Sequence, residues 1–328
     1  MRFLIAGGSV FGMLLGLPAA RADEAPAPKP ATAAPAGELK FDKPFLFAIK
    51  GEKRHSFVLG TIHLGDKRMT EMPEVLKSAL GAVDGIRTEL PMDPATMLGV
   101  AGKMARTDGK TLEESIGADL AQRAKTYLEK RGLSFAMVNN VQTMMAGTTL
   151  SMMEVPQPEQ LPPIDMQVYQ YGVDNGLDVG GLETVEEQMS ILTGAPEEKQ
   201  VHLFKVSMDL LEKAEREGTP NMTKLMNAYL SGDLEQVSKV MNEGMDKNDP
   251  IQAEFFDKLL KDRNVVMAER MTKLMKENPE KGYLFAIGTA HLRGEGKGVL
   301  ELLEAQGMKI KQLKPEDASK IKPRGKGA

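Results

Sequence analysis

Two of the four histidines in this chain of 328 residues lie in the same short sequence context. The segment Gly60-Thr61-Ile62-His63-Leu64 recurs as Gly288-Thr289-Ala290-His291-Leu292, and an apolar run precedes each copy. Neutral imidazole is the commonest side-chain metal ligand and also the usual general base near neutral pH. The glycine in each copy allows the backbone to approach closely at a tight turn. The repeat therefore predicts one site that contains His63 and His291, with Gly60 and Gly288 at its two turns.

Two glutamates, Glu89 and Glu183, follow apolar runs in a similar way. A carboxylate is costly to bury unless it is paired, protonated or bound to a metal, so both glutamates are candidates for the same site. The structural alternatives remain open here. Each glutamate could be an exposed strand end, Glu183 could accompany a helix that starts at Thr184, and each histidine could be a hydrogen-bonded residue at the start of a loop.

The elements that must position these residues follow from the spacing of apolar residues. Two apolar runs at 45–49 and 57–62 flank a polar segment and predict a β-hairpin. Other short strands are predicted at 84–90, 177–182, 283–290 and 308–313. Helices are predicted at 72–83, over most of 94–151, and at 165–175, 196–216, 221–230, 234–245, 251–276 and 298–306.

This order of elements predicts an α/β fold with a mixed central sheet and with large helical insertions. A proline cluster between 156 and 163 separates the first part from the second. His63, Glu89, Glu183 and His291 each follow a predicted strand. Since α/β folds bind ligands at the carboxyl ends of their strands, the four side chains could meet there.

The N-terminus has the pattern of an export signal. A basic start, an apolar stretch at 3–17 and the small residues of Ala20-Arg21-Ala22 predict a signal peptide at 1–22, cleaved after Ala22. Residues 23–37 are rich in proline and alanine and predict an extended linker, and the folded domain is expected at 38–314. The basic segment 315–328 is expected to be a frayed, solvated tail. The protein is thus predicted to be periplasmic or secreted, without a stable membrane span after cleavage; retention of the signal as an anchor is the alternative.

Composition excludes several classes of function. The chain has no cysteine, which rules out disulfides, thiolate metal sites and a cysteine nucleophile. A formal net charge of −4 argues against a nucleic-acid partner. The chain has no phosphate-binding Walker loop, no dinucleotide glycine motif, no Gly-x-Ser-x-Gly and no His-Glu-x-x-His. The remaining chemistry is that of histidine and glutamate at strand ends, and the oligomeric state is not predicted.

The strand-end motifs, taken with several later segments, resemble the TraB/GumN family, which includes the Tiki proteases and is more distantly similar to erythromycin esterase-like and ChaN-like proteins. The resemblance covers about 45–313. The residues that carry it are 59–64, 88–90, 181–184, 187–188, 229–234, Arg263-Asn264 with Met267, and 285–292 with Gly294. One departure is Arg293, where family members often have proline, and a charged residue there could alter substrate preference.

The resemblance implies two related halves, one pocket lined by the two Gly-x-x-His histidines and a glutamate, and a divalent-cation-dependent hydrolase. It also adds Arg263 and Asn264 to the site, although the sequence pattern alone places Arg263 on the solvated face of a helix. The leading hypothesis is an exported metal-dependent hydrolase that cleaves peptide or amide bonds.

In this hypothesis His63, Glu89 and His291 bind the cation, which could be Mn, Co or Zn. Glu183 or a histidine accepts a proton from the water that the cation activates, and Arg263 stabilises the oxyanion. One alternative is a non-catalytic periplasmic binding protein for a peptide, a metal or haem. Another is a metal-free esterase-like hydrolase with a histidine base supported by a glutamate, and the last is a scaffold with structural histidines. The expected partner is a peptide or another small molecule.

Overall fold

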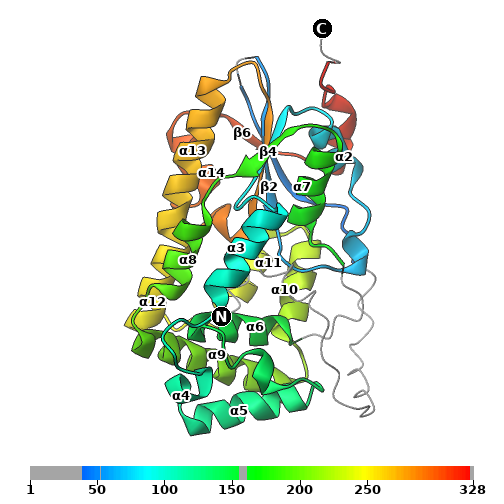
Figure 1. The fold of residues 1–328 in the computed structure, drawn as a ribbon. Helices are drawn as coiled ribbons and strands as arrows, with labels where there is room; N and C mark the ends of the chain where they lie inside the picture. Colours follow the sequence, from blue (N-terminus) through cyan, green and yellow to red (C-terminus); the bar gives the residue numbers. More distant parts are fainter. Residues whose placement is uncertain (1–38, 52, 155–160, 326–328) are drawn as a thin grey trace.

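The computed structural model describes residues 39–325, except for residue 52 and residues 155–160. The predicted signal peptide and linker lie outside the described residues, as does most of the proline cluster. Within the described part, a mixed sheet is flanked by helices, and a separate layer of helices lies beyond one edge of that sheet (Figure 1).

The sheet has six strands in the order β4-β3-β5-β2-β1-β6. The strands are β1 (Phe45–Ile49), β2 (Ser56–Thr61), β3 (Gly85–Thr88), β4 (Asp178–Gly181), β5 (Tyr283–Gly288) and β6 (Ile310–Gln312). β4, β3, β5 and β2 run parallel, whereas β1 is antiparallel to both β2 and β6. Every residue of β2 and of β5 is buried, as expected for apolar strands that are covered on both faces.

The predicted hairpin is confirmed, because β1 pairs with β2 in the register Phe45 to Gly60 and Ile49 to Ser56. The α/β class, the mixed sheet and the large helical insertions are confirmed as well. The fifth strand is shorter than predicted: it ends at Gly288, and Thr289–His291 forms a 3-10 turn.

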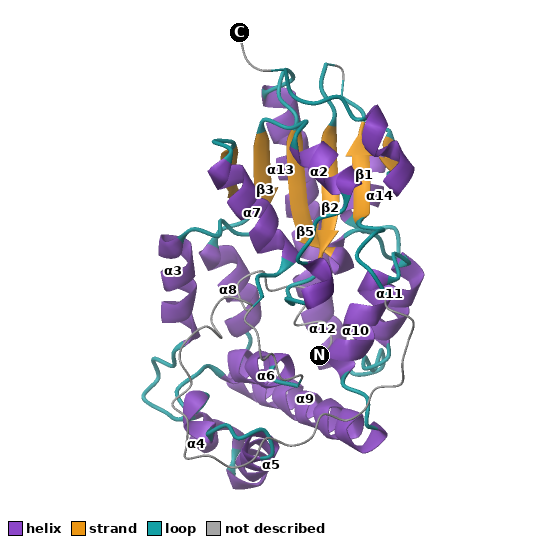
Figure 2. Ribbon diagram, turned by 90° about the vertical axis from the view of Figure 1, so that its right-hand side faces the viewer, coloured by secondary structure: helices purple, strands orange, loops and turns teal. Residues whose placement is uncertain are grey.

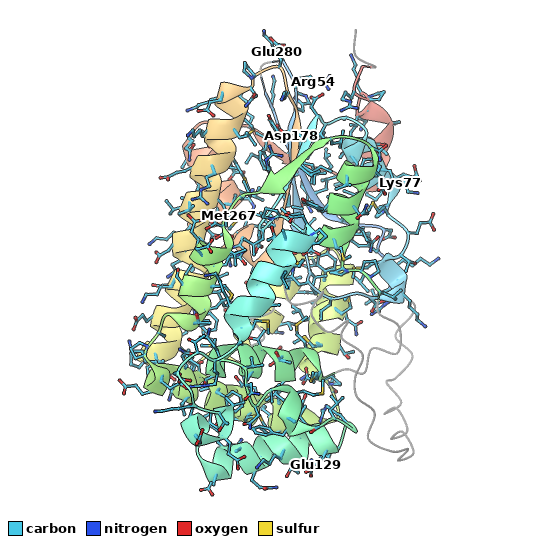
Figure 3. All side chains as sticks on the ribbon, viewed as in Figure 1. Arg54, Lys77, Glu129, Asp178, Met267 and Glu280 are labelled. Carbon is cyan, nitrogen blue, oxygen red and sulfur yellow. The ribbon has the colours of Figure 1, made fainter. Side chains whose placement is uncertain are left out.

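Helices cover both faces of the sheet (Figure 1). One face carries α2 and α7, and the other carries α13 and α14, with Met267 on the buried side of α13 (Figure 3). The bounds of these helices are α2 (Glu74–Leu80), α7 (Ile164–Asp174), α13 (Arg263–Glu277) and α14 (Val299–Ala305). Apolar residues from the strands and these helices form one continuous core.

A helical layer lies beyond the carboxyl edge of the parallel strands (Figure 2). Its helices are α3 (Pro94–Met104), α4 (Leu112–Ile116), α5 (Ala118–Glu129), α6 (Thr143–Met152), α8 (Val185–Thr193), α9 (Glu197–Glu217), α10 (Asn221–Leu230), α11 (Leu234–Asn242) and α12 (Pro250–Phe256). A second hydrophobic cluster among α4, α5, α6 and α9, centred on Tyr127, Phe204 and Met208, holds the far end of this layer together.

The predicted helix at 251–276 contains an irregularity. A π-helical turn, Asp257–Asp262, joins α12 to α13, so the backbone gains an extra residue per turn just before Arg263. Apolar spacing does not reveal such a turn, because the pattern on either side remains helical.

The segment that follows β6 is more ordered than the expectation of a frayed tail. Pro315–Lys320 forms a 3-10 helix against α2, and the Arg324 backbone N–H donates to the Gly81 carbonyl at 2.8 Å. The expectation of a frayed tail is therefore wrong for the described part of this segment. None of the helices formed by residues 39–325, gaps excluded, is both long and apolar enough to cross a membrane.

Candidate functional site

Four adjacent parallel strands each deliver one candidate residue at the same edge of the sheet. In the strand order β4-β3-β5-β2, the residues just beyond the carboxyl ends are Glu183, Glu89, His291 and His63. The register aligns Thr88 with both Gly181 and Ala286, and Thr61 with Gly288. The arrows of the parallel strands in Figure 2 point toward the helical layer, so the carboxyl ends of these strands face those helices.

The two imidazoles present their Nε2 atoms to one carboxylate oxygen. His63 Nε2 lies 3.9 Å from Glu89 Oε1, and His291 Nε2 lies 3.8 Å from the same atom. Both Nε2 atoms are buried and have no hydrogen-bond partner within the described part of the chain. A buried polar nitrogen without a partner is uncommon, because it loses its hydration without replacement.

Each imidazole is held from behind through Nδ1. Asp165, in the first turn of α7, accepts a hydrogen bond from His63 Nδ1. Asn264 Oδ1 accepts from His291 Nδ1 at 2.6 Å, and its Nδ2 donates to the Lys297 carbonyl at 2.8 Å, which fixes the orientation of the amide. In both neutral rings the proton is therefore on Nδ1, and the lone pair of Nε2 faces Glu89.

Glu89 lies at the centre of the cluster and is fully engaged. Its Oε1 accepts from the Gly288 backbone N–H at 2.7 Å, and its Oε2 accepts from Arg263 Nη2 at 2.7 Å. The Gly288 contact joins the second histidine motif directly to the glutamate. The position of Glu89 is thus set by α13 and β5, which are both far from Glu89 in the sequence.

Arg263 links the two glutamates. Its Nε donates to Glu183 Oε1 at 2.9 Å, and its Nη2 donates to Glu183 Oε2 at 2.7 Å, in addition to the bond with Glu89. Gln188 Nε2 donates to Glu183 Oε2 at 3.0 Å and to Glu89 Oε2 at 3.4 Å. Arg263 is only 3% exposed, so these are charge-assisted bonds in a buried setting.

Local sequence signals explain how α8 and α13 bring these residues to the site. Thr184 and Glu187 form a capping box that starts α8, which places Gln188 one turn beyond Glu183. Arg270, two turns after Arg263, donates to the Leu182 carbonyl and to Glu187, and so attaches α13 to the same loop. A helix that starts at Thr184 was the alternative to a place in the cluster for Glu183, and the structure contains both.

The burial and charge of the cluster shift several pKa values. Burial lowers the pKa of His291 to about 3, with the Arg263 charge acting in the same direction. Burial also opposes protonation of His63, but the charge and hydrogen bond of Asp165 outweigh it and raise that pKa. Burial favours a neutral Glu89, yet the charge of Arg263 and the hydrogen bond from the Gly288 backbone hold its pKa at about 2. The two histidines therefore differ in their affinity for a proton.

These named side chains have an excess of negative charge that a cation could balance. The cluster contains three buried carboxylates, Asp165, Glu89 and Glu183, and one buried guanidinium, that of Arg263. A metal ion at ~2.1 Å from two ligand atoms fits between atoms up to about 4.2 Å apart, and both Nε2 to Oε1 distances are within that span. The described residues contain no preformed group of three or more His, Cys, Asp or Glu side chains in coordinating geometry. Two unpartnered imidazole nitrogens nevertheless converge on one carboxylate oxygen, which is the feature that a proposed divalent cation would use.

The glycines and Arg293 have different surroundings. A Cβ atom at Gly60 would lie 2.5 Å from Leu292 Cδ1 and 3.0 Å from Phe45 Cβ, so the first glycine is required for packing. The Gly60 carbonyl also accepts from the Tyr229 hydroxyl at 2.9 Å. Arg293 is exposed and paired with Glu304 at 2.8 Å, outside the buried cluster.

Sequence reasoning missed Asp165 and Gln188. Asp165 follows a proline-rich loop and not a strand, and Gln188 is one polar residue in an amphipathic helix, so neither matches the strand-end pattern. The only available signal for Asp165 was an acidic residue at the start of a helix, which normally indicates a favourable interaction with the helix dipole.

The fold and this cluster define a class of protein: the chain belongs to the TraB/PrgY/gumN family, whose model matches residues 45–312. This confirms the family resemblance. No solved structure matches the chain significantly.

The curated relatives that the chain resembles are metalloproteases by name. Danio rerio metalloprotease TIKI2 is 26% identical over 322 residues, which cover 83% of this chain and 61% of that protein. Danio rerio metalloprotease TIKI1 is 27% identical over 312 residues (81% and 62%), and Homo sapiens metalloprotease TIKI1 is 25% identical over 313 residues (81% and 61%). The matches thus span only about three fifths of these relatives.

Proposed function

We propose that the protein is an exported metal-dependent hydrolase that cleaves peptide or amide bonds. The observation that carries this proposal is the pair of buried, unpartnered Nε2 atoms at 3.8 and 3.9 Å from one Glu89 oxygen. The names of the similar metalloproteases support the reaction class. The signal-like residues 1–22 support the proposal of export, and the proposed catalytic domain is 38–314.

His63, His291 and Glu89 would hold the cation, and Mn, Co and Zn all suit such ligands. A bound divalent cation supplies Lewis acidity, which polarises a carbonyl group and activates water. Asp165 and Asn264 orient the two imidazoles through hydrogen bonds at Nδ1, as hydrogen-bond partners of metal-binding histidines generally do.

Glu183 and Arg263 were both expected to take part in catalysis. The hydrogen bonds of the Glu183 carboxylate go to Arg263 and Gln188, so this carboxylate is committed to contacts within the cluster. Arg263 likewise donates from Nε and Nη2 to the two glutamates and from Nη1 to the Leu259 carbonyl, so an oxyanion would compete with these acceptors. We therefore propose that both residues position Glu89, and that catalytic contacts with substrate require a rearrangement of this ion-pair network.

A metal-free hydrolase is the second candidate, and the His63–Asp165 pair favours it. A carboxylate behind Nδ1 holds an imidazole in the tautomer in which Nε2 accepts a proton, which is the arrangement of a histidine base.

The test uses the chain from Asp23 onward, the proposed mature form, freed of metal and then supplied with Mn, Co or Zn. Cleavage of a mixed peptide library is followed by mass spectrometry for the wild type, His63→Ala and His291→Ala. His55→Ala is the matched control, because His55 is exposed on the β1–β2 hairpin.

Metal-dependent cleavage that is lost in both site variants and kept in the control supports the proposal. Cleavage that is insensitive to chelation would favour the metal-free base. Metal uptake without turnover would indicate a binding protein, and turnover that survives both substitutions would place the chemistry elsewhere.

A further inference from the structure

A cavity of about 590 Å³ lies beside the second histidine motif, beneath the carboxyl edge of the sheet. Its wall includes Thr289 and Ala290, which directly precede His291, and Asn264, which accepts the hydrogen bond from His291 Nδ1. A ligand in this cavity would therefore contact the residues that hold one of the candidate metal ligands. The cavity has the size typical of small-molecule and peptide side-chain sites.

The floor of the cavity is apolar. Val237 and Met241 from α11 and Phe256 from α12 are each less than a tenth exposed and line it, and Leu260 from the π-helical turn adds to them. Methionine is flexible and polarisable, so it adapts to apolar groups of different shapes. These residues favour an uncharged, apolar ligand group.

The rim of the cavity carries charges of both signs that are paired with each other. Lys261 lies 2.8 Å from Asp257 and 3.5 Å from Glu295, and Lys247 lies 3.7 Å from Glu295. A rim of this kind gives no net attraction for a phosphate or another multiply charged anion, but it offers hydrogen-bond partners to a peptide backbone.

The backbone around the cavity departs from regular structure in two places. Glu295 is the one described residue other than glycine with a positive φ, 51°, and it lies on the rim between Gly294 and Gly296. The π-helical turn contributes Asp257, Leu260 and Lys261 to the lining. Strained residues and π-helical turns both occur preferentially at functional sites.

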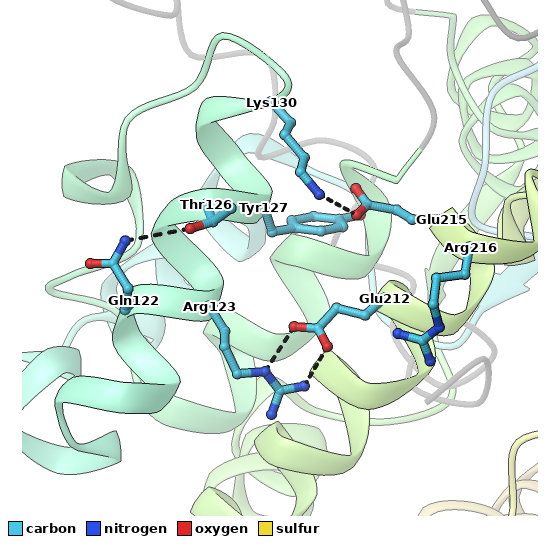
Figure 4. Close-up of a pocket in the computed structure, with 8 residues that line it drawn as sticks. All are labelled: Gln122, Arg123, Thr126, Tyr127, Lys130, Glu212, Glu215 and Arg216. Atoms are coloured by element: carbon cyan, nitrogen blue, oxygen red, sulfur yellow. Dashed lines mark hydrogen bonds and ion pairs between the residues drawn. The ribbon is translucent and has the colours of Figure 1, made fainter.

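A second cavity, between α5 and α9, is lined mainly by polar and charged side chains (Figure 4). Arg123 is paired with Glu212, and Lys130 is paired with Glu215, across the two helices. These bonds link α5 to α9, which lie at the end of the helical layer far from the sheet (Figure 1). The cavity beside His291 is thus the better candidate for substrate binding.

We infer that the cavity formed by α11, α12, the π-helical turn and the 289–295 loop binds an apolar side chain of a peptide substrate next to the bond that is cleaved. The inference rests on the proposed hydrolase function, to which it adds a substrate class: peptides with a large aliphatic, methionine or phenylalanine residue near the cleavage point. Because Thr289 and Ala290 of the second histidine motif line the cavity, we expect its occupant to be the substrate and not a separate effector.

The test uses a substitution that should obstruct the opening of the cavity. Ser238 is exposed on α11 and lines the cavity, whereas its neighbour Lys239 is equally exposed and does not line it. Ser238→Trp should obstruct the cavity, and Lys239→Trp is the matched control for the added indole. Met241→Ala, which enlarges the floor, is the second variant.

Two measurements are made on the chain from Asp23 onward. The first is the affinity for a set of peptides that differ at one central position, Leu, Met or Phe against Asp or Lys, by titration calorimetry without metal. The second is the pattern of cleavage sites in a peptide library with metal. The wild type should prefer the apolar residue by about tenfold or more, and Ser238→Trp should remove that preference while Lys239→Trp retains it. Met241→Ala should shift the preference toward the larger apolar residues.

The outcomes separate this inference from the proposed function. Selective binding without cleavage would retain the cavity assignment and reject the hydrolase. Cleavage without apolar preference, or with a preference that both tryptophan variants share, would overturn the cavity assignment and leave the hydrolase in place. Absence of both binding and cleavage would overturn both.

Discussion

Arg263 is a buried cation whose surroundings determine what its removal would do. It makes ion pairs with Glu89 and Glu183 at 2.7 Å each, and all three side chains are at most 5% exposed. Burying an ion pair contributes little net stability, but removing one member leaves the other charge buried without compensation. Replacement of Arg263 would therefore include the free-energy cost of leaving Glu89 and Glu183 buried without a counter-ion.

We predict that Arg263→Met lowers the free energy of unfolding by about 3–5 kcal/mol in the metal-free protein, because two carboxylates lose their counter-ion. Urea-induced unfolding measures the change. The double variant Arg263→Met/Glu183→Gln should recover part of the loss, since it leaves one buried charge fewer. A double variant no more stable than Arg263→Met would contradict this account of the pair.

A second prediction concerns the unequal support of the two imidazoles. Asp165→Asn retains an acceptor for His63 Nδ1 but removes the negative charge, so the ring becomes a less basic ligand. Metal affinity, measured by calorimetry, should fall about tenfold to a hundredfold. Asn264→Asp adds a negative charge behind His291 but loses the hydrogen bond to the Lys297 carbonyl, so its loss of metal affinity should be smaller than that of Asp165→Asn. Equal losses in both variants would indicate general damage to the fold.

At the scale of the elements, the sheet edge explains why the site forms. Four parallel strands end side by side, so a polar residue that follows each strand is brought to its neighbours without any further requirement. The sequence reveals this much, because an apolar run and the polar residue after it are local features. His63, Glu89, Glu183 and His291 were found in this way.

The same reasoning could not find contacts made across the fold. The pairing of β2 with β5 joins Gly60 to Ile287, and the His63–Asp165 contact spans 102 residues. Such contacts depend on how α7 packs against the sheet, which no local pattern specifies. Asp165 was missed for this reason, and Arg263 was placed in the site only through the family resemblance.

The close packing behind β2 makes the first glycine sensitive to substitution. We predict that Gly60→Ala lowers the free energy of unfolding by about 1–3 kcal/mol, because its Cβ atom would overlap Leu292 Cδ1 and press on Phe45. Thermal and urea unfolding measure the loss. Gly99→Ala is the control, since a Cβ atom there meets nothing within 4 Å. An equal loss at both positions would exclude this steric explanation.

The start of α12 provides a pH-dependent element away from the site. Asp249 caps this helix by accepting from the Ile251 and Gln252 backbone N–H groups, and its Oδ2 also contacts His202 Nε2 at 2.6 Å. Burial opposes ionisation, but the bonds from His202 and Gln252 outweigh it and lower the Asp249 pKa to about 2. Because the folded-state pKa is below the unfolded one, the stabilisation is present above about pH 4 and is lost as the pH falls toward 2.

We predict that Asp249→Ala lowers the free energy of unfolding by about 1 kcal/mol near neutral pH through loss of the cap. The difference between wild type and variant should shrink as the pH is lowered from 4 to about 2, because the wild-type carboxyl becomes protonated. Unfolding titrations across this range provide the measurement. A difference that stays constant would show that the charge of Asp249 contributes nothing.

At the scale of the whole molecule, the candidate site joins parts that are otherwise separate. His63 and Glu89 come from the first part of the chain, whereas Glu183, Arg263 and His291 come from the second, on strands and helices that share the central core. A cation held at this point would be bound by the folded chain and not by the unfolded one, since the ligands converge only in the fold. Binding would therefore stabilise the protein as a unit.

The magnitude of that stabilisation follows from linkage. With free metal at about 100 times its dissociation constant, the free energy of unfolding should rise by about 2.7 kcal/mol, and a chelator should reverse the gain. Differential scanning calorimetry of the metal-free protein with added Mn, Co or Zn measures it as a rise in Tm. His63→Ala and His291→Ala should each remove most of the rise, whereas His202→Ala should keep it, because His202 pairs with Asp249 outside the cluster. If the site variants kept the full rise, the cation would be bound elsewhere, and the buried imidazoles would have to be explained by a metal-free role.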